Sequence, residues 1–418
     1  MSEWVESSLN QLVTFQKGRK VETSTYAKPG YDNYLGASGI EGGADGYAAT
    51  RFAVTAKPTD LLMLWDGERS GLVGYGRQGV VASTVSKLTP NQAIISGYLY
   101  YALSRSFDWI QNRRTGTGVP HVPKDLGRIL RLSFPKNLHE QQRIAAILTS
   151  IDTAIEKTEA LIEKYRQIKA GLMHDLFTCG VLPNGQLRPP REQSPELYQE
   201  TAIGWFPREW SVVPLRKLVG AANIVNGPFG SDLLTSELRA EGVPVLYVQD
   251  VKAGVFSRVS NAHVTKAKAN ELAFCNVKRD DVLVAKVGAP PCDSCVYPFD
   301  EMAVVTQDVI RVRPGADVNA EYMSSLLNSP YGRKAVKRIS IEGTRERVSL
   351  TEFKGLSFPV AESHEQSLIG ARLEKAQASI AAEGVKLEKL RLQKHGLMQD
   401  LLTGKVPVKV GAGETANG

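Results

Sequence analysis

The fold is decided by a pattern that the chain contains twice: His139-Glu140-Gln141 with Lys169-Ala170-Gly171-Leu172-Met173, and then His364-Glu365-Gln366 with Lys394-His395-Gly396-Leu397-Met398. Both parts recur at one offset, because 364 − 139 and 394 − 169 are both 225. A shared offset over about forty residues is typical of helices, since loops change length between copies. The sequence therefore predicts two long helices of equal length.

The repeat continues upstream of each helix, with an offset that becomes smaller toward the N-terminus. The matches are Trp4, Leu9 and Leu12 with Trp210, Leu215 and Leu218; Tyr34-Leu35 with Tyr247-Val248; Asp60 to Leu64 with Asp281 to Ala285; and Leu132 to Pro135 with Leu356 to Pro359. Short apolar runs between glycines indicate strands. We predict an α+β fold with strand-rich domains at 1–137 and 210–362, long helices at 138–178 and 363–403, a linker at 179–209 and a flexible tail at 404–418.

Each predicted long helix has a seam of mostly apolar residues at alternating steps of four and three. The first seam is Ile144, Leu148, Ile151, Ile155, Thr158, Ile162, Tyr165, Lys169, Leu172 and Leu176, and the second is Ile369, Leu373, Ala376, Ile380, Glu383, Leu387, Leu390, Lys394, Leu397 and Leu401. A heptad seam of this kind indicates a coiled coil. We predict that the two helices pair in antiparallel orientation, and a bundle without any recognition role is the alternative.

The composition is that of a folded, mildly basic protein. With 42% hydrophobic and 23% charged residues, the 418-residue chain has enough apolar residues for more than one core. The net charge of +7 favours a polyanionic partner. Basic residues cluster at Tyr101–Lys136 and again at Arg333, Lys334, Lys337, Arg338, Arg345 and Arg347, where a solvated charged face is the alternative. No membrane-length apolar run or signal pattern is found, so we expect a cytoplasmic protein with free thiols.

Motifs of catalysis and metal binding are weak in this sequence. It has no phosphate-binding loop of the Gly-x-x-x-x-Gly-Lys type. Asn328-Ser329-Pro330-Tyr331 lacks one proline of a methyltransferase-like tetrapeptide, and a helix end explains it better. Cys292-Asp293-Ser294-Cys295 has zinc-ligand spacing, but no second close pair completes a site, so we expect a loop with two free thiols and no metal. The pattern favours binding over catalysis.

The repeat resembles the DNA-specificity subunits of type I restriction-modification systems over nearly the whole chain. The motifs that carry the resemblance are Leu138 to Ile144, Lys169 to Met173, their copies at His364 and Lys394, and Ile203-Gly204-Trp205-Phe206-Pro207 with Trp210. The resemblance implies two target-recognition domains that each read half of a bipartite, asymmetric DNA site, with the helices setting the spacer. It also implies a non-catalytic chain without cofactors, which assembles with two methyltransferase subunits and two restriction subunits. S-adenosylmethionine, ATP and Mg would bind those partners.

Arginine and lysine contact phosphates or guanine edges, so basic residues between framework strands are the predicted DNA readers. They are Lys17, Arg19, Arg69, Arg77, Arg113 and Arg114 in the first domain, and Lys252, Arg258, Lys286, Arg345 and Arg347 in the second. The predicted contacts to the partner subunit or between the helices are Glu140, Gln141, Ile144, Ile151, Leu172, Glu365, Gln366, Ile369 and Leu397. The competing hypotheses are a fused DNA methyltransferase and a structural repeat protein without DNA affinity.

Overall fold

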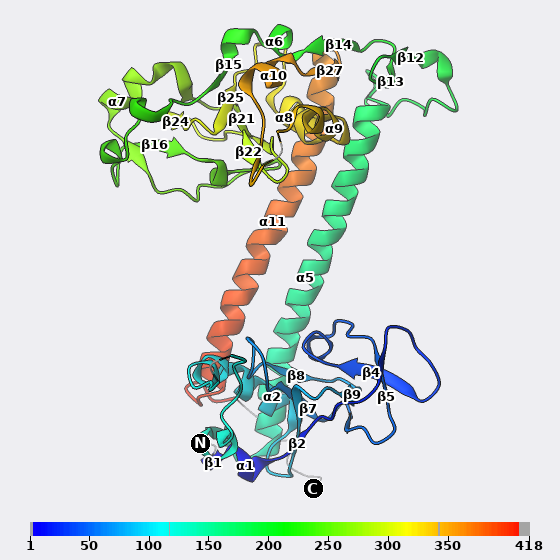
Figure 1. The fold of residues 1–418 in the computed structure, drawn as a ribbon, viewed down its shortest axis with the longest axis vertical. Helices are drawn as coiled ribbons and strands as arrows, with labels where there is room; N and C mark the ends of the chain where they lie inside the picture. Colours follow the sequence, from blue (N-terminus) through cyan, green and yellow to red (C-terminus); the bar gives the residue numbers. More distant parts are fainter. Residues whose placement is uncertain (1–2, 117, 342, 409–418) are drawn as a thin grey trace. The chain divides into compact units, whose positions relative to one another are not determined.

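The computed structural model describes residues 3–116, 118–341 and 343–408, and the chain divides into two compact units. Unit 1 contains residues 1–159 and 385–418, and unit 2 contains residues 160–384. Each unit has a strand-rich domain and one part of each long helix, α5 (Leu138–Thr178) and α11 (Ser363–Leu401) (Figure 1). Unit 1 is therefore assembled from both ends of the chain, whereas unit 2 is one continuous segment.

The predicted α+β class and the two packed long helices are confirmed. In unit 1, Lys394 on α11 forms an ion pair with Asp152 on α5 at 2.6 Å. In unit 2, Lys169 on α5 donates a hydrogen bond to Gln377 on α11 at 2.7 Å. The start of one helix therefore lies beside the end of the other within each unit, as antiparallel pairing requires. All twenty seam residues are buried or half-buried.

The two lysine contacts are copies of one another in the repeat, since Lys169 and Lys394 differ by 225 and so do Asp152 and Gln377. Their chemistry differs. Asp152 gives Lys394 an anionic partner and also accepts a hydrogen bond from the Tyr101 hydroxyl at 2.8 Å. Gln377 gives Lys169 a neutral partner, and burial lowers the pKa of Lys169. The helix pair is thus symmetric in geometry and asymmetric in charge.

The strand-rich domain of unit 1 contains three sheets. β1 (Trp4–Ser8) pairs with β11 (Arg131–Pro135); β2 (Val13–Lys17), β10 (Val85–Pro90), β7 (Leu61–Leu64) and β8 (Val73–Tyr75) form a second sheet in that order; and β3 (Thr23–Ser24), β5 (Tyr47–Ala49), β4 (Tyr31–Leu35), β9 (Gly79–Val81) and β6 (Thr55–Ala56) form the third. The short helices are α1 (Leu9–Leu12), α2 (Ser96–Arg105), α3 (Phe107–Gln111) and α4 (Leu126–Ile129).

Unit 2 repeats this framework. β14 (Ser211–Pro214) pairs with β27 (Ser357–Val360); β15 (Ile224–Asn226), β25 (Val309–Val312), β21 (Val282–Ala285) and β23 (Ser294–Val296) form the second sheet; and β19 (His263–Val264), β16 (Val243–Leu246), β24 (Ala303–Val305) and β20 (Asn276–Val277) form the third. Three pairs are additional: β12 (Tyr198–Thr201) with β13 (Gly204–Pro207), β17 (Val251–Lys252) with β18 (Val255–Phe256), and β22 (Val287–Gly288) with β26 (Glu346–Arg347). The helices are α6 (Leu215–Leu218), α7 (Lys266–Glu271), α8 (Ala320–Asn328), α9 (Pro330–Ile339) and α10 (Leu350–Gly355).

Strand register tests the residue matches that define the repeat. Leu64 pairs with Val85, and Ala285 pairs with Val309, so the predicted match of β7 with β21 is confirmed. The match of Tyr34 with Tyr247 is wrong by two residues. Tyr34 pairs in parallel with Val80, and the equivalent parallel pair in unit 2 is Val245 with Val304. Tyr34 lies within β4, whereas Tyr247 follows the end of β16, so the two tyrosines occupy different positions of the framework.

The match of Trp4 with Trp210 is confirmed, whereas the match of Leu132 to Pro135 with Leu356 to Pro359 is wrong by two residues. Gln141 donates to the carbonyl of Pro135 and Gln366 donates to that of Ala361, so Pro135 corresponds to Ala361. Trp4 pairs with Pro135, and Ser211, which follows Trp210, pairs with Val360, which precedes Ala361. Both indole rings lie against the glycine that follows a long helix. A Cβ atom on Gly404 would lie 2.8 Å from the Trp4 ring, and one on Gly180 would lie 2.9 Å from the Trp210 ring.

The first turn of each long helix is joined to its own domain by buried polar side chains. Gln141 accepts a hydrogen bond from the backbone N–H of Ile95 at 2.9 Å and donates to the carbonyls of Ala93 and Pro135. Gln366 makes the equivalent bonds to Asn319 and Ala361. Both amides are almost fully buried. Each glutamine therefore fixes the direction in which a long helix leaves the sheet.

In unit 2 the neighbouring carboxylate completes this joint. Glu365 is 6% exposed and accepts hydrogen bonds from the indole N–H of Trp210 at 3.0 Å, from Arg188 at 3.0 Å and from the N–H of Val181 at 2.6 Å. Arg188 also pairs with Glu209. The segment at 179–209, predicted as a linker, thus supplies a buried cation to the start of α11.

Both units have packed apolar interiors that include the helix ends. Ile144 and Leu148 of α5 belong to the unit 1 core, and Ile369 and Leu373 of α11 belong to the unit 2 core. Each of these cores also contains the central sheet of its unit, so the helices are extensions of the domain cores. Within the described ranges, no helix combines the length and apolar character needed to cross a bilayer.

We predict that Glu365→Gln lowers the free energy of unfolding by about 2–4 kcal/mol, because a glutamine would turn an NH₂ donor toward the donors of Arg188 and leave a buried guanidinium short of its anion. Urea unfolding of the full chain measures the effect. Glu362→Gln is the matched control, since Glu362 is exposed. Equal stability of the two variants would contradict the assignment of Glu365 as the centre of the joint.

Candidate nucleic-acid interface

One loop is held in the same way in both units. In unit 1, Thr115 and His121 exchange two backbone hydrogen bonds, and His121 also bridges to Asp66. In unit 2, Ile341 and Arg347 exchange the same two bonds, and Arg347 pairs with Val287. We call residues 115–121 and 341–347 the paired loops. Because the framework fixes both ends of each loop, the residues at its base have defined neighbours in both domains.

In unit 2 the paired loop forms one side of a groove with a volume of about 740 Å³. Its side chains include two amides, two hydroxyls and two cations, which are Gln249, Gln307, Thr306, Thr344, Lys252 and Arg345. Amides and guanidinium groups are the side chains that read base edges in duplex DNA. Two predicted DNA readers, Lys252 and Arg345, therefore meet in one groove.

Two further predicted readers lie beside this groove. The backbone N–H of Lys286 bonds to the carbonyl of Asp308, which lines the groove, and its ammonium lies 5.8 Å from the centre of the Phe229 ring. Arg347 is exposed at the base of the paired loop. Four predicted DNA readers therefore lie in or beside this groove, namely Lys252, Lys286, Arg345 and Arg347.

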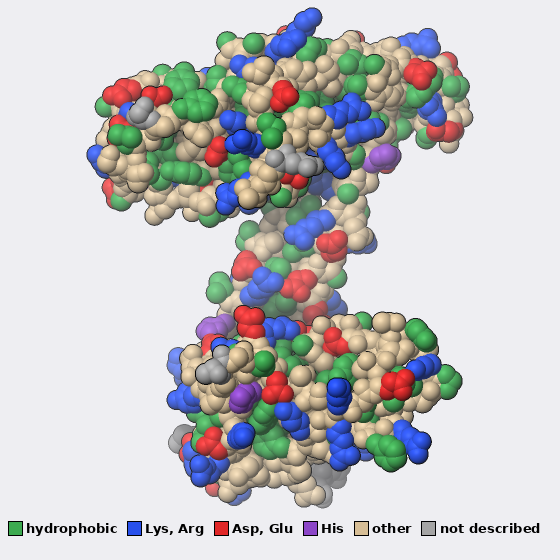
Figure 2. All heavy atoms as spheres, in the orientation of Figure 1, with side chains coloured by type: hydrophobic (Ala, Val, Ile, Leu, Met, Phe, Trp, Pro, Cys, Tyr) green, Lys and Arg blue, Asp and Glu red, His purple; other side chains and the backbone are tan. Residues whose placement is uncertain are grey.

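The helix α9 adds a basic face. Its residues belong to the basic cluster found in the sequence, but they were not among the predicted DNA readers. Lys334, Lys337 and Arg338 are exposed on α9, and within the described part of the chain no carboxylate pairs with them. Figure 2 shows several Lys and Arg side chains on the visible face of unit 2 over α9 and the β22–β26 region. Lys337 and Arg338 lie 224 residues after Arg113 and Arg114, which is also the offset between the preceding helices. The repeat could therefore have identified these two residues as candidate DNA readers.

We predict that replacing all three residues of the α9 face with alanine weakens binding to any duplex by a similar factor. Each lost phosphate contact should reduce the slope of log K against log salt concentration by about 1. Fluorescence anisotropy of the full chain over a salt series measures the slope. Lys375→Ala, an exposed lysine on α11, is the control. An unchanged slope in the triple variant would exclude α9 from the DNA surface.

In unit 1 four of the six predicted cations lie together. The Lys17 ammonium pairs with Asp66 at 2.9 Å, and Arg114 donates to the carbonyl of Glu68. Arg69 pairs with Glu41 at 2.8 Å, and Arg77 lies against the next residue, Gly42. We call Lys17, Arg69, Arg77 and Arg114 the cation row. The cation row lies along the loop at 66–69. The paired loop of unit 1 contacts this loop at Asp66.

The remaining two cations of unit 1 are exposed. Arg113 stacks on the ring of Trp109, with its guanidinium carbon 4.0 Å from the ring centre. Arg19 follows Lys17 by two residues on the surface. Both are therefore accessible to a ligand from solvent.

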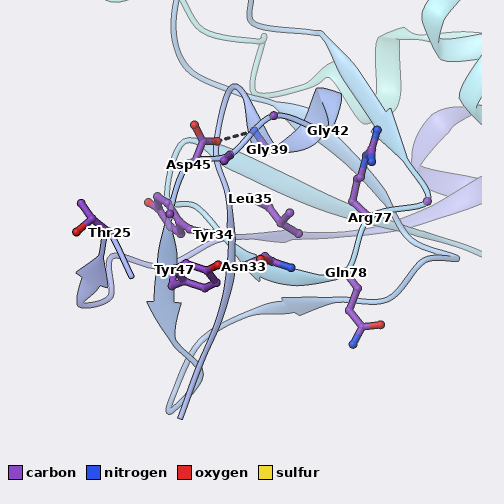
Figure 3. A pocket seen from close by; sticks show the side chains of 14 residues that line it. Thr25, Asn33, Tyr34, Leu35, Gly39, Gly42, Asp45, Tyr47, Arg77 and Gln78 are labelled. Atoms are coloured by element: carbon purple, nitrogen blue, oxygen red, sulfur yellow. Dashed lines mark hydrogen bonds between the residues drawn. The ribbon is translucent and has the colours of Figure 1, made fainter. Parts of the chain in front are cut away.

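A hollow of about 870 Å³ lies at one end of the cation row (Figure 3). Its walls include Asn33, Tyr34, Asp45, Tyr47 and Arg77, and the glycines among its lining residues expose backbone. The carboxylate of Asp45 is held by the N–H of Gly39 at 2.6 Å. Arg77 is the only one of these residues that was predicted from the sequence, because Asn33, Tyr34, Asp45 and Tyr47 are not basic.

Arg258 is a correction to the predicted DNA readers. Its guanidinium donates to the carbonyls of Val245 and Ala262, both at 2.8 Å, and to the hydroxyl of Ser260. It also lies 4.0 Å from Asp250, a fully buried carboxylate. These bonds direct the cation into the domain, where it supports β16. Arg258 does lie between strands, as the sequence indicated, but its side chain stabilises the fold.

We predict that Arg258→Ala lowers the free energy of unfolding by about 2–3 kcal/mol, because it leaves buried acceptors without their charged donor. Lys252→Ala is the matched control from the same prediction. Since Lys252 is exposed in the groove, its removal should change stability by no more than about 0.5 kcal/mol. Urea unfolding of both variants tests the contrast, and a stable Arg258→Ala protein would restore Arg258 to the candidate DNA readers.

The residues predicted to contact a partner subunit or the other helix separate into two groups. Glu140, Gln141, Glu365 and Gln366 are buried inside their own units, so their side chains are not exposed for a partner. Gln141, Gln366 and Glu365 belong to the helix–domain joint, and contact of these residues with a partner subunit stays a prediction. The seam residues Ile144, Ile151, Leu172, Ile369 and Leu397 are buried or half-buried along the helices.

The two motifs with possible chemistry have structural explanations. Ser329 caps the N-terminus of α9 by accepting from the N–H of Gly332, so Asn328 to Tyr331 marks a helix boundary. Cys292 and Cys295 belong to different apolar clusters, and burial raises the pKa of each thiol to about 12. Among the described residues, no three His, Cys, Asp or Glu side chains are placed to hold a metal ion.

Comparison with known proteins shows which proteins this chain resembles. Residues 1–164 match the family model described as the type I restriction modification DNA specificity domain. The type I restriction enzyme MjaVIII specificity subunit of Methanocaldococcus jannaschii is 26% identical over 419 residues, which covers 97% of this chain and 94% of that protein.

Solved structures agree with this placement at the level of the fold. The crystal structure of the type I S subunit from M. genitalium superposes with a TM-score of 0.65 at 17% identity, covering 98% of this chain and 97% of that one. A structure described in terms of complex assembly and conformational transition of the type I restriction-modification system gives a TM-score of 0.50 at 15% identity, covering 96% and 98%. Residues 1–164 therefore match a type I restriction modification DNA specificity domain, and over nearly its whole length the chain is similar to type I specificity subunits.

Proposed function

We propose that this chain reads a bipartite, asymmetric DNA site, with one half-site bound by each unit, and directs partner methyltransferase and restriction subunits to that site. The observation that carries the proposal is the pair of equivalent surfaces in units 1 and 2. Both are built at the paired loop, and both gather basic side chains there. Two copies of one reading surface in a single chain are suited to two half-sites on one duplex.

The equivalent positions of the two surfaces carry different residues. Trp65 and Lys286 each accept the backbone hydrogen bond that follows the paired loop, and His121 corresponds to Arg347 at its base. An indole and an ammonium cannot make the same contact with a base or a phosphate. The two half-sites should therefore differ in sequence, and the whole site should lack twofold symmetry.

The long helices are suited to fixing the spacing between half-sites. Both α5 and α11 contribute to both units, and their seams are buried or half-buried along their length. The rise of an α-helix is fixed at about 1.5 Å per residue. A change in helix length should therefore change the number of unread base pairs, without changing either half-site.

The same proposal gives this chain two methyltransferase partners and two restriction partners. The cofactors S-adenosylmethionine, ATP and Mg are placed on those partners, and this chain supplies the DNA address. Binding of chromosomal DNA would locate the assembly in the cytoplasm. Exposed apolar residues on α5 and α11, such as Ile168 and Leu392, are available for helix contacts with a partner.

Methylation mapping tests the proposal. We expect genomic DNA from cells that carry this chain with its methyltransferase to contain modified adenines at one bipartite motif, and DNA from cells that lack only this chain to contain none there. Modification that is independent of the chain would favour a methyltransferase with its own specificity. No motif in the presence of an active methyltransferase, together with no salt-dependent DNA binding by the full chain, would favour the structural repeat protein.

A further inference from the structure

Arg77 lies in an unusual position at the wall of the unit 1 hollow. Its side chain extends from the turn between β8 and β9 toward Gly42, as Figure 3 shows. A Cβ atom at position 42 would lie 2.4 Å from Nη2, 2.8 Å from Cζ and 2.9 Å from Nη1 of Arg77. The guanidinium therefore occupies the space that any other residue at position 42 would need.

Arg77 also differs from the rest of the cation row in its partners. Lys17 and Arg69 have carboxylate partners, and Arg114 donates to backbone carbonyls. Arg77 forms no ion pair or hydrogen bond within the described ranges, and its Nε atom is buried without an acceptor. The two Nη groups have no partner there either and are not buried, so they are accessible to a ligand that carries hydrogen-bond acceptors.

We propose that Arg77 reads a guanine in the half-site bound by unit 1, by donating hydrogen bonds to the guanine O6 and N7 atoms in the major groove. This inference rests on the proposed function, because it assigns one base contact within that function. A guanidinium has donors in a rigid fork that matches the two acceptors of guanine. The Nη donors of Arg77 have no acceptor among residues 3–116, 118–341 and 343–408.

The surroundings of Arg77 favour a base edge over a phosphate as the ligand. The carboxylate of Asp45 lines the same hollow and would repel a phosphate. The amide of Asn33 also lines it, and carboxylates and amides are acceptors and donors for the exocyclic groups of bases. The exposed cations Lys17 and Arg69 lie nearby on the surface and are better placed for phosphate contacts.

Gly42 fixes the guanidinium for this task. Its φ of +94° is a conformation that favours glycine, and its missing side chain makes room for Arg77. A reader held in place before binding loses less conformational freedom when the complex forms. Gly42 is thus a positioning residue for Arg77, and substitution at either position should affect the same base pair.

The experiment maps methylation motifs for the full chain expressed with its methyltransferase, comparing the wild type with Arg77→Lys and Gly42→Ala. Lysine keeps the charge of Arg77 but lacks the rigid fork. We expect Arg77→Lys to accept other bases at one guanine position, with modification of the altered sites rising at least about 10-fold relative to the cognate site. Gly42→Ala should relax the same position in the same half-site.

Arg391→Lys is the matched control, because Arg391 on α11 is exposed and already ion-paired with Glu159 and Glu388. It should leave the motif unchanged. Thermal unfolding of each purified variant shows whether the fold is retained, and Arg77→Lys remains informative if Gly42→Ala does not fold.

Three results would overturn the inference. The first is an unchanged motif in Arg77→Lys with a uniform loss of modification, which is the behaviour of a phosphate contact. The second is a wild-type motif without guanine in either half-site. The third is equal relaxation in Arg391→Lys. In each case the wild-type chain still defines a motif, whereas failure of the proposed function would leave no chain-dependent motif at all.

Discussion

The buried amide at the first turn of each long helix is the interaction on which the architecture depends. Gln141 bonds to the last residue of β11 and to the turn before α2. Gln366 bonds to the residue that follows β27 and to the turn before α8. Buried amides tolerate little misplacement, because unpaired donors and acceptors are costly. Each glutamine therefore holds a long helix at a fixed angle to the sheets of its own unit.

The two joints differ in how they are completed, and the difference follows from which segments form each unit. Unit 2 is continuous, so its segment at 179–209 can return to the start of α11 and supply Arg188 to Glu365. Unit 1 is assembled from both chain ends, and Gly404 and Trp4 take the places of Gly180 and Trp210. The same packing is thus achieved once within a continuous segment and once between the two ends of the chain.

Much of this fold could be predicted from sequence, because helices preserve length and seams preserve period. The offset of 225 located α5 and α11, and the heptad positions are the residues that are buried or half-buried. The short matches were less secure. Tyr34 with Tyr247, and Leu132 to Pro135 with Leu356 to Pro359, are each wrong by two residues, because connecting segments differ in length between the two copies. Sequence also could not tell that Glu365 and Gln366 face their own domain, because a polar pair at a helix start is equally compatible with a partner surface.

The sequence was sufficient to predict which regions of the chain form the candidate site, but not which basic side chains in those regions are available to bind DNA. Lys252 and Arg258 are six residues apart, yet one is exposed in the groove and the other is bonded to three backbone or hydroxyl acceptors. Charge alone cannot separate them, because the acceptors come from residues 245 and 262, on either side of the loop. The repeat held more information than the residue types, as the correspondence of Lys337 and Arg338 with Arg113 and Arg114 shows.

The framework and the reading surfaces are under opposite constraints. Framework positions must match in both units, and Leu61 pairs with Leu88 as Val282 pairs with Val312. At the site, Lys17 and Asn226 occupy the same strand position, opposite Ser86 and Ile310, yet one is a cation and the other an amide. A duplicated framework makes the geometry of the two readings alike, and substitution at its edges makes their chemistry different. Asymmetry of the DNA site is therefore a property of the side chains and does not require asymmetry of the fold.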